Sequence, residues 1–124
     1  MKTFILASLF LTGCVDMPSA FDSVLYDHIV AISVNADQDR ALCGTPAMPA
    51  AISALNRESK QALLYSTYTA KDTHDSIAVV DKSISEMAAV YALGIPSKEY
   101  CELKLGVIEL DAEIVLTGLG DKSK

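Results

Sequence analysis

The chain is poor in basic residues, in histidine and in the short motifs that carry most enzyme chemistry. Its 10 Lys and Arg residues are outnumbered by 16 Asp and Glu residues, and the net charge is −6 at pH 7. This balance argues against a nucleic-acid partner and against electrostatic docking on anionic lipid. The sequence contains no glycine-rich phosphate loop, no GxSxG, no HExxH and no CxxC. We therefore expect no cofactor, no metal site and no catalytic residues.

The first residues have the pattern of an export signal. Met1-Lys2 is followed by an apolar run from Phe4 to Leu11. A basic start, a short apolar stretch and small residues after it are typical of such a signal. The run is too short to cross a hydrocarbon core, which needs about 20 residues. An ordinary secretory peptide and a buried helix of a cytosolic protein are the alternatives.

The end of this segment favours a more specific interpretation. The residues Leu11-Thr12-Gly13-Cys14 resemble a bacterial lipobox. This resemblance implies that residues 1–13 are a lipoprotein signal peptide, cleaved between Gly13 and Cys14. Cys14 then carries a diacylglycerol on its sulfur and commonly an acyl chain such as palmitate on its amino group. Two or three chains hold a protein firmly to a membrane, whereas one holds it only marginally.

Cleavage leaves one small domain on a short tether. Residues 14–20 form the lipidated cysteine and the tether, residues 21–120 the helical domain, and residues 121–124 a polar tail. Without Lys2 the chain has 9 basic and 16 acidic residues, a net charge of −7. Any partner must therefore sit close to the membrane that holds the lipid.

The cysteine count is odd, with three in the chain, which in an exported protein requires an explanation. If Cys14 is lipidated, Cys43 and Cys101 remain, and an oxidising periplasm favours their pairing. They are 58 positions apart, and closing such a loop stabilises a fold by about 4 kcal/mol in the chain-entropy model. Two separate buried thiols are the alternative.

The spacing of apolar residues predicts helices in the first half of the domain. One runs from about Phe21 to Asn35, and the next starts between Pro46 and Pro49 and ends near Thr69. Steps of three and four place apolar side chains on one side of each helix. The candidate buried residues are Phe21, Leu25, His28 or Ile29, Ile32, Met48, Ile52, Leu55, Ala62, Leu63 and Tyr65.

Two further helices follow. Asp72 or Thr73 is expected to cap the third, which ends at residues 93–96, where Gly94 permits a left-handed turn and Pro96 blocks continuation. Ser97 is expected to cap the fourth. We predict an all-α fold, a small three- to four-helix bundle joined by one disulfide. The apolar seam of the third helix is Ile77, Val80, Ile84, Met87 and Tyr91.

Part of the last helix also fits a strand. Residues 107–117 include an alternation of apolar and acidic residues from Ile108 to Ile114, which is typical of a half-buried strand. The β-branched run 29–34 is a possible partner. We favour a helix because Ser97 is a good cap and because no tight-turn pair such as Asn-Gly marks a hairpin.

As a helix, the last segment carries two apolar seams. One contains Leu103, Val107, Leu110 and Ile114, and the other contains Cys101, Leu105, Ile108, Ala112, Val115 and Leu119. Lys104 and Asp111 project between them, so both charges are expected to be half-buried and to need partners. Together with His28 they form a candidate partner-binding or buried polar cluster. Alternatively, Lys104 runs its stem along apolar surface and keeps its ammonium in water.

The second histidine offers little catalytic potential. His74 lies in Asp72-Thr73-His74-Asp75, which loosely resembles a metal-ligand cluster. We interpret this segment as the solvated start of a helix. Catalysis through His28 or His74 is the weakest of the functional hypotheses, and we expect the chain not to be an enzyme.

Several short motifs resemble small helical lipoproteins encoded by tailed bacteriophages. They are Phe21-Asp22-Ser23, Tyr26, Cys43 and the run from Pro96 to Lys104. The resemblance implies a membrane-anchored periplasmic module that acts on an envelope protein, as superinfection-exclusion factors do. A structural lysis component such as an outer-membrane spanin subunit is the alternative. Spanins tend to be proline-rich, whereas this chain has four prolines.

The residue after the lipidated cysteine bears on which membrane is used. In enteric lipoproteins an aspartate there tends to retain the protein in the inner membrane. Here the residue is Val15, and Asp16 comes one later. The resemblance therefore favours the inner leaflet of the outer membrane, with the domain facing the periplasm.

Overall fold

The computed structural model describes residues 20–122. The proposed signal peptide, its cleavage site at Gly13 and the lipidation site Cys14 lie outside the described residues. Residues 20–122 form four α-helices and a short 3₁₀ helix, and they contain no strand. The helices are α1 (Ser23–Asp39), η1 (Arg40–Leu42), α2 (Met48–Thr69), α3 (Lys71–Leu93) and α4 (Lys98–Asp121). The predicted all-α fold is confirmed, and the strand alternative for residues 107–117 is wrong.

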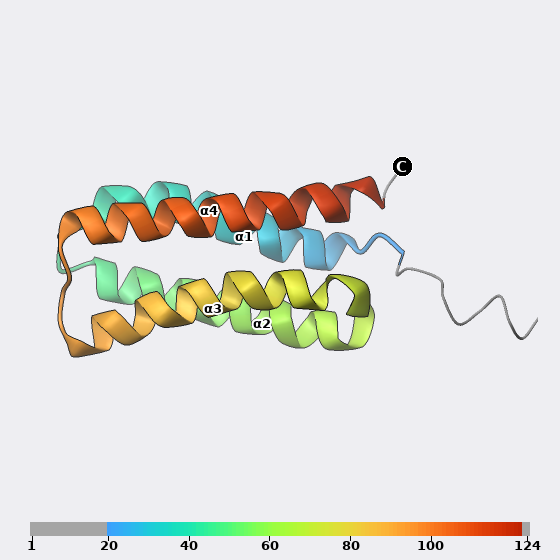
Figure 1. The fold of residues 1–124 in the computed structure, drawn as a ribbon, viewed down its shortest axis with the longest axis horizontal. Helices are drawn as coiled ribbons and strands as arrows, with labels where there is room; N and C mark the ends of the chain where they lie inside the picture. The colour runs from blue at the N-terminus through green and yellow to red at the C-terminus, as the bar shows by residue number, and fades with distance from the viewer. Residues whose placement is uncertain (1–19, 123–124) are drawn as a thin grey trace, which may run out of the picture.

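The four long helices pack as a rod-shaped bundle in which each contacts two neighbours (Figure 1). The contacting pairs are α1 with α2, α2 with α3, α3 with α4, and α4 with α1. The start of α1, the α2–α3 turn and the end of α4 lie together at one end, which we call the proximal end. The opposite end, the disulfide end, contains η1 and the α3–α4 loop.

The helix ends follow local chemistry, with one exception. Asp22 caps α1 by accepting from the backbone N–H groups of Val24 and Leu25, and Ser97 caps α4 by accepting from that of Tyr100, as expected. The predicted caps Asp72 and Thr73 are wrong, because α3 already begins at Lys71. A single residue, Ala70, joins α2 to α3, which leaves no room for a later cap.

Two other boundaries show what determines helix ends here. Helix α1 extends to Asp39, four residues past the expected end at Asn35, because Ala36 continues the buried side of the helix. Helix α3 ends at Leu93, as predicted, and the next residue, Gly94, has a φ of 145°, outside the region that residues with a Cβ readily adopt.

The core is the apolar side of each helix turned toward the bundle axis. The predicted seam of α3, from Ile77 to Tyr91, is buried throughout. So are Leu25, Ile29 and Ile32 of α1. Phe21 was also expected inside, but it precedes the helix and is 38% exposed, with its ring 5.7 Å from that of Tyr26.

A disulfide joins Cys43 to Cys101, as predicted. The two Cα atoms are 5.6 Å apart, and both side chains are buried. The bond links the segment after η1 to the first turn of α4, so it fastens the disulfide end of the bundle. It also fixes the rotation of α4, because Cys101 must face inward.

Replacing both Cys43 and Cys101 by alanine should lower the free energy of unfolding by about 4 kcal/mol, because the unfolded chain regains the entropy of a long open loop. Urea denaturation of the oxidised protein and of the double variant measures the difference. A loss below about 1 kcal/mol would show that the unfolded chain is already compact around this loop.

Candidate functional site

The candidate cluster of His28, Lys104 and Asp111 is not assembled in the structure. His28 Nδ1 lies 2.8 Å from Glu58 Oε1 on α2. Lys104 Nζ lies 3.8 Å from Glu86 Oε2 on α3, and Asp111 accepts a hydrogen bond of 3.4 Å from Ser83. His28 therefore pairs with α2, whereas the two α4 residues pair with α3. As expected, Lys104 and Asp111 are half-buried and have partners.

His74 makes a contact that the sequence did not indicate. Its Nδ1 lies 2.9 Å from the hydroxyl of Ser66, which is completely buried. The Ser66 hydroxyl donates to the carbonyl of Leu63 at 2.8 Å, so its proton is directed at the backbone and not at the imidazole. The Ser66 hydroxyl therefore belongs to the packing of α2 against α3, and a substrate cannot reach it. Residues 20–122 contain no group of three or more potential metal ligands.

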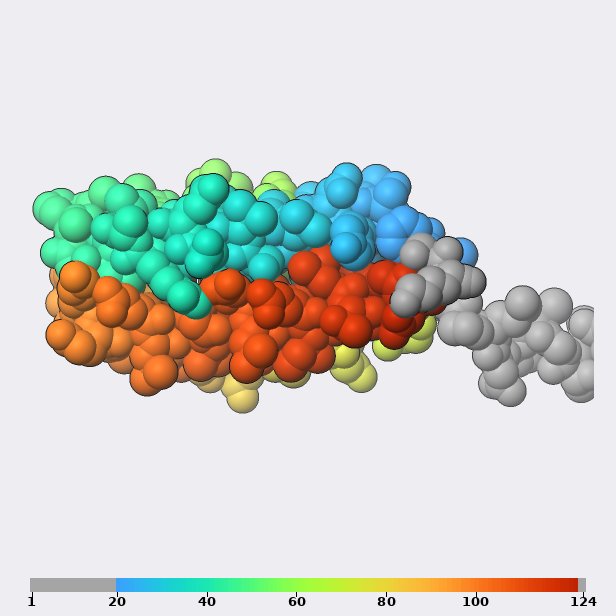
Figure 2. Space-filling view, turned by 90° about the horizontal axis from the view of Figure 1, so that it is seen from above, coloured from blue at the N-terminus to red at the C-terminus, as the bar shows by residue number. Residues whose placement is uncertain are grey.

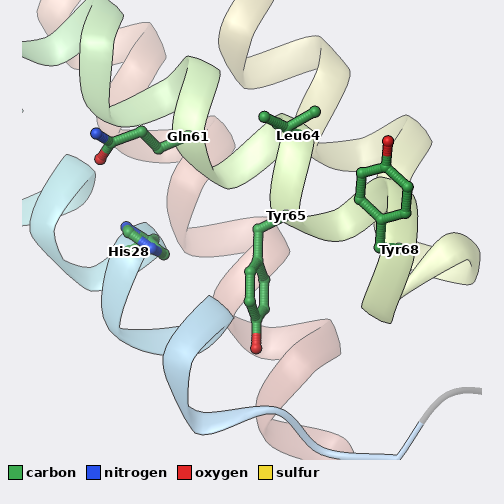
Figure 3. Close-up of a pocket in the computed structure, with 5 residues that line it drawn as sticks. All are labelled: His28, Gln61, Leu64, Tyr65 and Tyr68. Carbon is green, nitrogen blue, oxygen red and sulfur yellow. The ribbon is translucent and has the colours of Figure 1, made fainter.

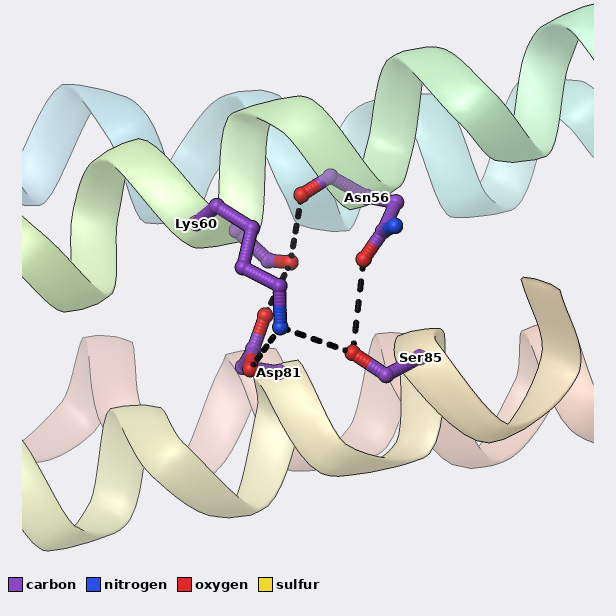
Figure 4. A network of polar contacts seen from close by, with 5 residues as sticks. Asn56, Lys60, Asp81 and Ser85 are labelled. Atoms are coloured by element: carbon purple, nitrogen blue, oxygen red, sulfur yellow. Dashed lines mark hydrogen bonds and ion pairs between the residues drawn. The ribbon is translucent and has the colours of Figure 1, made fainter. Parts of the chain in front are cut away.

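A polar network connects α2 to α3 near the middle of the bundle (Figure 4). The buried carboxylate of Asp81 accepts from Ser59 at 2.8 Å and from Lys60 Nζ at 2.7 Å. Lys60 also donates to Ser85 at 3.0 Å, and Ser85 donates to Asn56. Ser59 sits four residues after the buried Leu55, a polar residue in an apolar register. Asp81 likewise lies four residues after the buried Ile77, and these two positions were the sequence signal for the network.

An open apolar groove of about 440 Å³ lies between α1 and α2 toward the proximal end (Figure 3). It is lined by His28 from α1 and by Gln61, Leu64, Tyr65 and Tyr68 from α2. Leu64 and Tyr68 are 62% and 78% exposed. The Tyr65 hydroxyl donates to the N-cap residue Asp22 at 3.3 Å, and this hydrogen bond raises the pKa of Tyr65. The groove therefore reaches the first residues of the folded domain.

The two apolar seams of α4 differ in burial. The seam that contains Cys101 is buried along its whole length. The other seam faces solvent, with Leu103 69%, Val107 40%, Leu110 57% and Ile114 61% exposed. We call these four residues the α4 stripe. Helix α4 lies open to solvent along the face that it shares with α1 (Figure 2).

The borders of the α4 stripe are charged. Glu99, Glu102 and Glu113 are exposed, and Glu109 pairs with Arg40 of η1. On the α3 side, Val79 is 55% exposed and lines a small hollow of about 150 Å³ together with Asp111 and Ile114. The stripe is therefore an apolar surface with a mainly acidic rim.

Replacing Lys60 by alanine should destabilise the bundle by about 1–3 kcal/mol, because the Asp81 carboxylate stays buried and loses its cation. Lys82→Ala is the matched control, since Lys82 is exposed on the same helix as Asp81. Urea denaturation of both variants measures the effect. If the Lys60→Ala and Lys82→Ala variants were equally stable, water would replace the Lys60 ammonium beside Asp81 without cost.

Two observations complete the description of the chain. No helix within residues 20–122 is both long enough and apolar enough to span a bilayer. Comparison with known proteins gives no match to a family model, to a curated protein or to a solved structure.

Proposed function

We propose that the chain is a lipid-tethered binding module of a bacterial envelope, which docks on an envelope protein through the α4 stripe. The α4 stripe is the observation that carries this proposal. Scattered apolar side chains are normal on a protein surface, whereas a contiguous apolar surface with a polar rim is typical of an interaction site.

The geometry of the α4 stripe favours a helical partner. Its residues are spaced by four, three and four positions, the spacing of a two-helix seam. A partner helix places its own apolar residues between Leu103, Val107, Leu110 and Ile114, as in other helix-in-groove complexes. Because Glu99, Glu102 and Glu113 border the stripe, a partner with Lys or Arg beside its seam is favoured. A second copy of this chain brings the same acidic rim and is less suitable.

The anchor is supported by the sequence around Cys14. Helix α1 begins at Ser23, nine residues after this cysteine. An anchored module meets its partner at a raised effective concentration, because both are confined to one membrane. A surface of four side chains can then suffice for binding, although it is small for two proteins in solution.

Photo-cross-linking in the envelope of expressing cells tests the docking surface. A photoreactive residue in place of Leu110 should give one discrete adduct with an envelope protein, because the side chain lies in the contact. The same residue in place of Val34, which is 46% exposed on α1, should give none. Val107→Ser should reduce the Leu110 adduct about fivefold, since loss of an apolar contact at the centre of an interface costs about 1 kcal/mol.

Stability measurements keep this test interpretable. Val107→Ser and the matched control Val34→Ser should each change the free energy of unfolding by less than about 0.5 kcal/mol, because both side chains are exposed. An adduct from position 34 equal to that from position 110, or an adduct only with another copy of the chain, would contradict the proposed partner.

The intact mass of the protein purified from the envelope tests the anchor. We expect a chain that begins at Cys14, is heavier by its acyl chains and gains two hydrogens on reduction of the Cys43–Cys101 bond. An unprocessed chain with an unmodified Cys14 would rule out the lipoprotein assignment.

The resemblance to phage lipoproteins suggests superinfection exclusion as the biological role. Expression of the chain alone should then protect cells from infection by a second phage without harming growth, and Val107→Ser should abolish the protection. Toxicity, or a lysis defect on deletion without any effect on infection, would instead support a lysis component.

A further inference from the structure

The apolar side chains at the proximal end form a second surface, separate from the α4 stripe. Val24, Leu64 and Tyr68 are 49%, 62% and 78% exposed. Val24 is one turn before His28 on the same side of α1, and His28, Leu64 and Tyr68 line the apolar groove. We call Val24, Leu64, Tyr65 and Tyr68 the proximal patch.

We propose that the proximal patch docks on the interface of a zwitterionic phospholipid bilayer, the membrane to which Cys14 is tethered. This inference rests on the proposed lipid anchor. The first argument is reach. Residues 14–20 span at most about 25 Å when fully extended, so the start of α1 cannot move far from the headgroups.

Depth gives the second argument. Leu64 lies five residues before the end of α2, and Val24 is the second residue of α1. At 1.5 Å per residue, the patch lies within about 9 Å of the proximal end of both helices. Apolar faces of interfacial helices enter the headgroup region by about 5–10 Å. The patch can therefore meet the acyl boundary while the rest of the bundle stays in water.

The chemistry of the patch gives the third argument. Figure 3 shows the rings of Tyr65 and Tyr68 extending from α2 in different directions, with that of Tyr65 reaching toward the start of α1. Tyr68 is the more exposed of the two, at 78%. Tyrosine prefers the membrane interface, because its ring is apolar and its hydroxyl is polar.

Charge selects the type of lipid. Asp27 is exposed next to His28, the His28 ring pairs with Glu58, and the mature chain carries a net charge of −7. These charges oppose anionic headgroups. Docking must then depend on apolar contact with zwitterionic lipid, and it requires the tether, since a few side chains alone bind a bilayer weakly.

The absence of tryptophan from the chain allows a direct test. Tyr68→Trp introduces a single fluorophore into the patch, and Leu103→Trp introduces one at a 69% exposed position of α4 near the disulfide end. Each chain, beginning at Cys14 as in the proposed mature protein, is coupled through the Cys14 thiol to a maleimide lipid in phosphatidylethanolamine–phosphatidylcholine vesicles. Cys43 and Cys101 do not react, because they form the disulfide. Vesicles that contain lipid brominated near the headgroup then quench a tryptophan that reaches the acyl boundary.

We expect the tryptophan at position 68 to lose about half of its emission or more, because interfacial insertion brings it against the brominated chains. The tryptophan at position 103 should lose little. Leu64→Ser in the Tyr68→Trp chain should reduce the quenching, whereas Val34→Ser should not. Equal quenching at positions 68 and 103, or none at either, would overturn the proposal.

This test is independent of cellular acylation, because the tether is chemical. If the intact mass shows no acyl chain on Cys14 but position 68 is quenched, the anchor assignment fails, and the patch contacts lipid only when the chain is held at the membrane by other means. If Cys14 is acylated and position 68 is not quenched, the anchor stands and the patch fails.

Discussion

A helix in a square bundle of four can bury only the side that faces its two neighbours, and this limit determines the surface of the whole domain. Helix α4 is apolar on two opposite sides, so one of them must face water. Cys101 decides which one, because its bond to Cys43 fixes the rotation of the first turn. The seam that continues from Cys101 to Leu119 is therefore buried, and the α4 stripe is left outside.

The sequence predicted the four helices because each buries one side, and such a side recurs every three or four residues. Local signals at Gly94 and Ser97 also placed two helix ends correctly. The caps at Asp72 and Thr73 failed because a one-residue connection determined where α3 begins. The pairing of Cys43 with Cys101 followed from the number of cysteines and from the expected compartment.

The side-chain partners were harder to predict, because they depend on how each helix is rotated against its neighbours. Periodicity shows that α4 has two seams, but it cannot show which one meets α1 and α3. For the same reason the sequence could not show that His28 faces α2, whereas Lys104 and Asp111 face α3. Asp81 and Ser59 were missed since polar residues inside an apolar register look like interruptions of the pattern. Their hydrogen bond shows that they belong to the α2–α3 interface.

The one-residue connection between α2 and α3 has a consequence for the order in which the chain folds. These two helices are neighbours in sequence and in space, so their contacts close almost no loop and should form first. The contacts between α1 and α4 join the two ends of the domain and must form later. We therefore expect the Cys43–Cys101 bond to form last, after the non-covalent packing of α1 against α4 has brought the two thiols together. Once formed, the bond holds that packing in place.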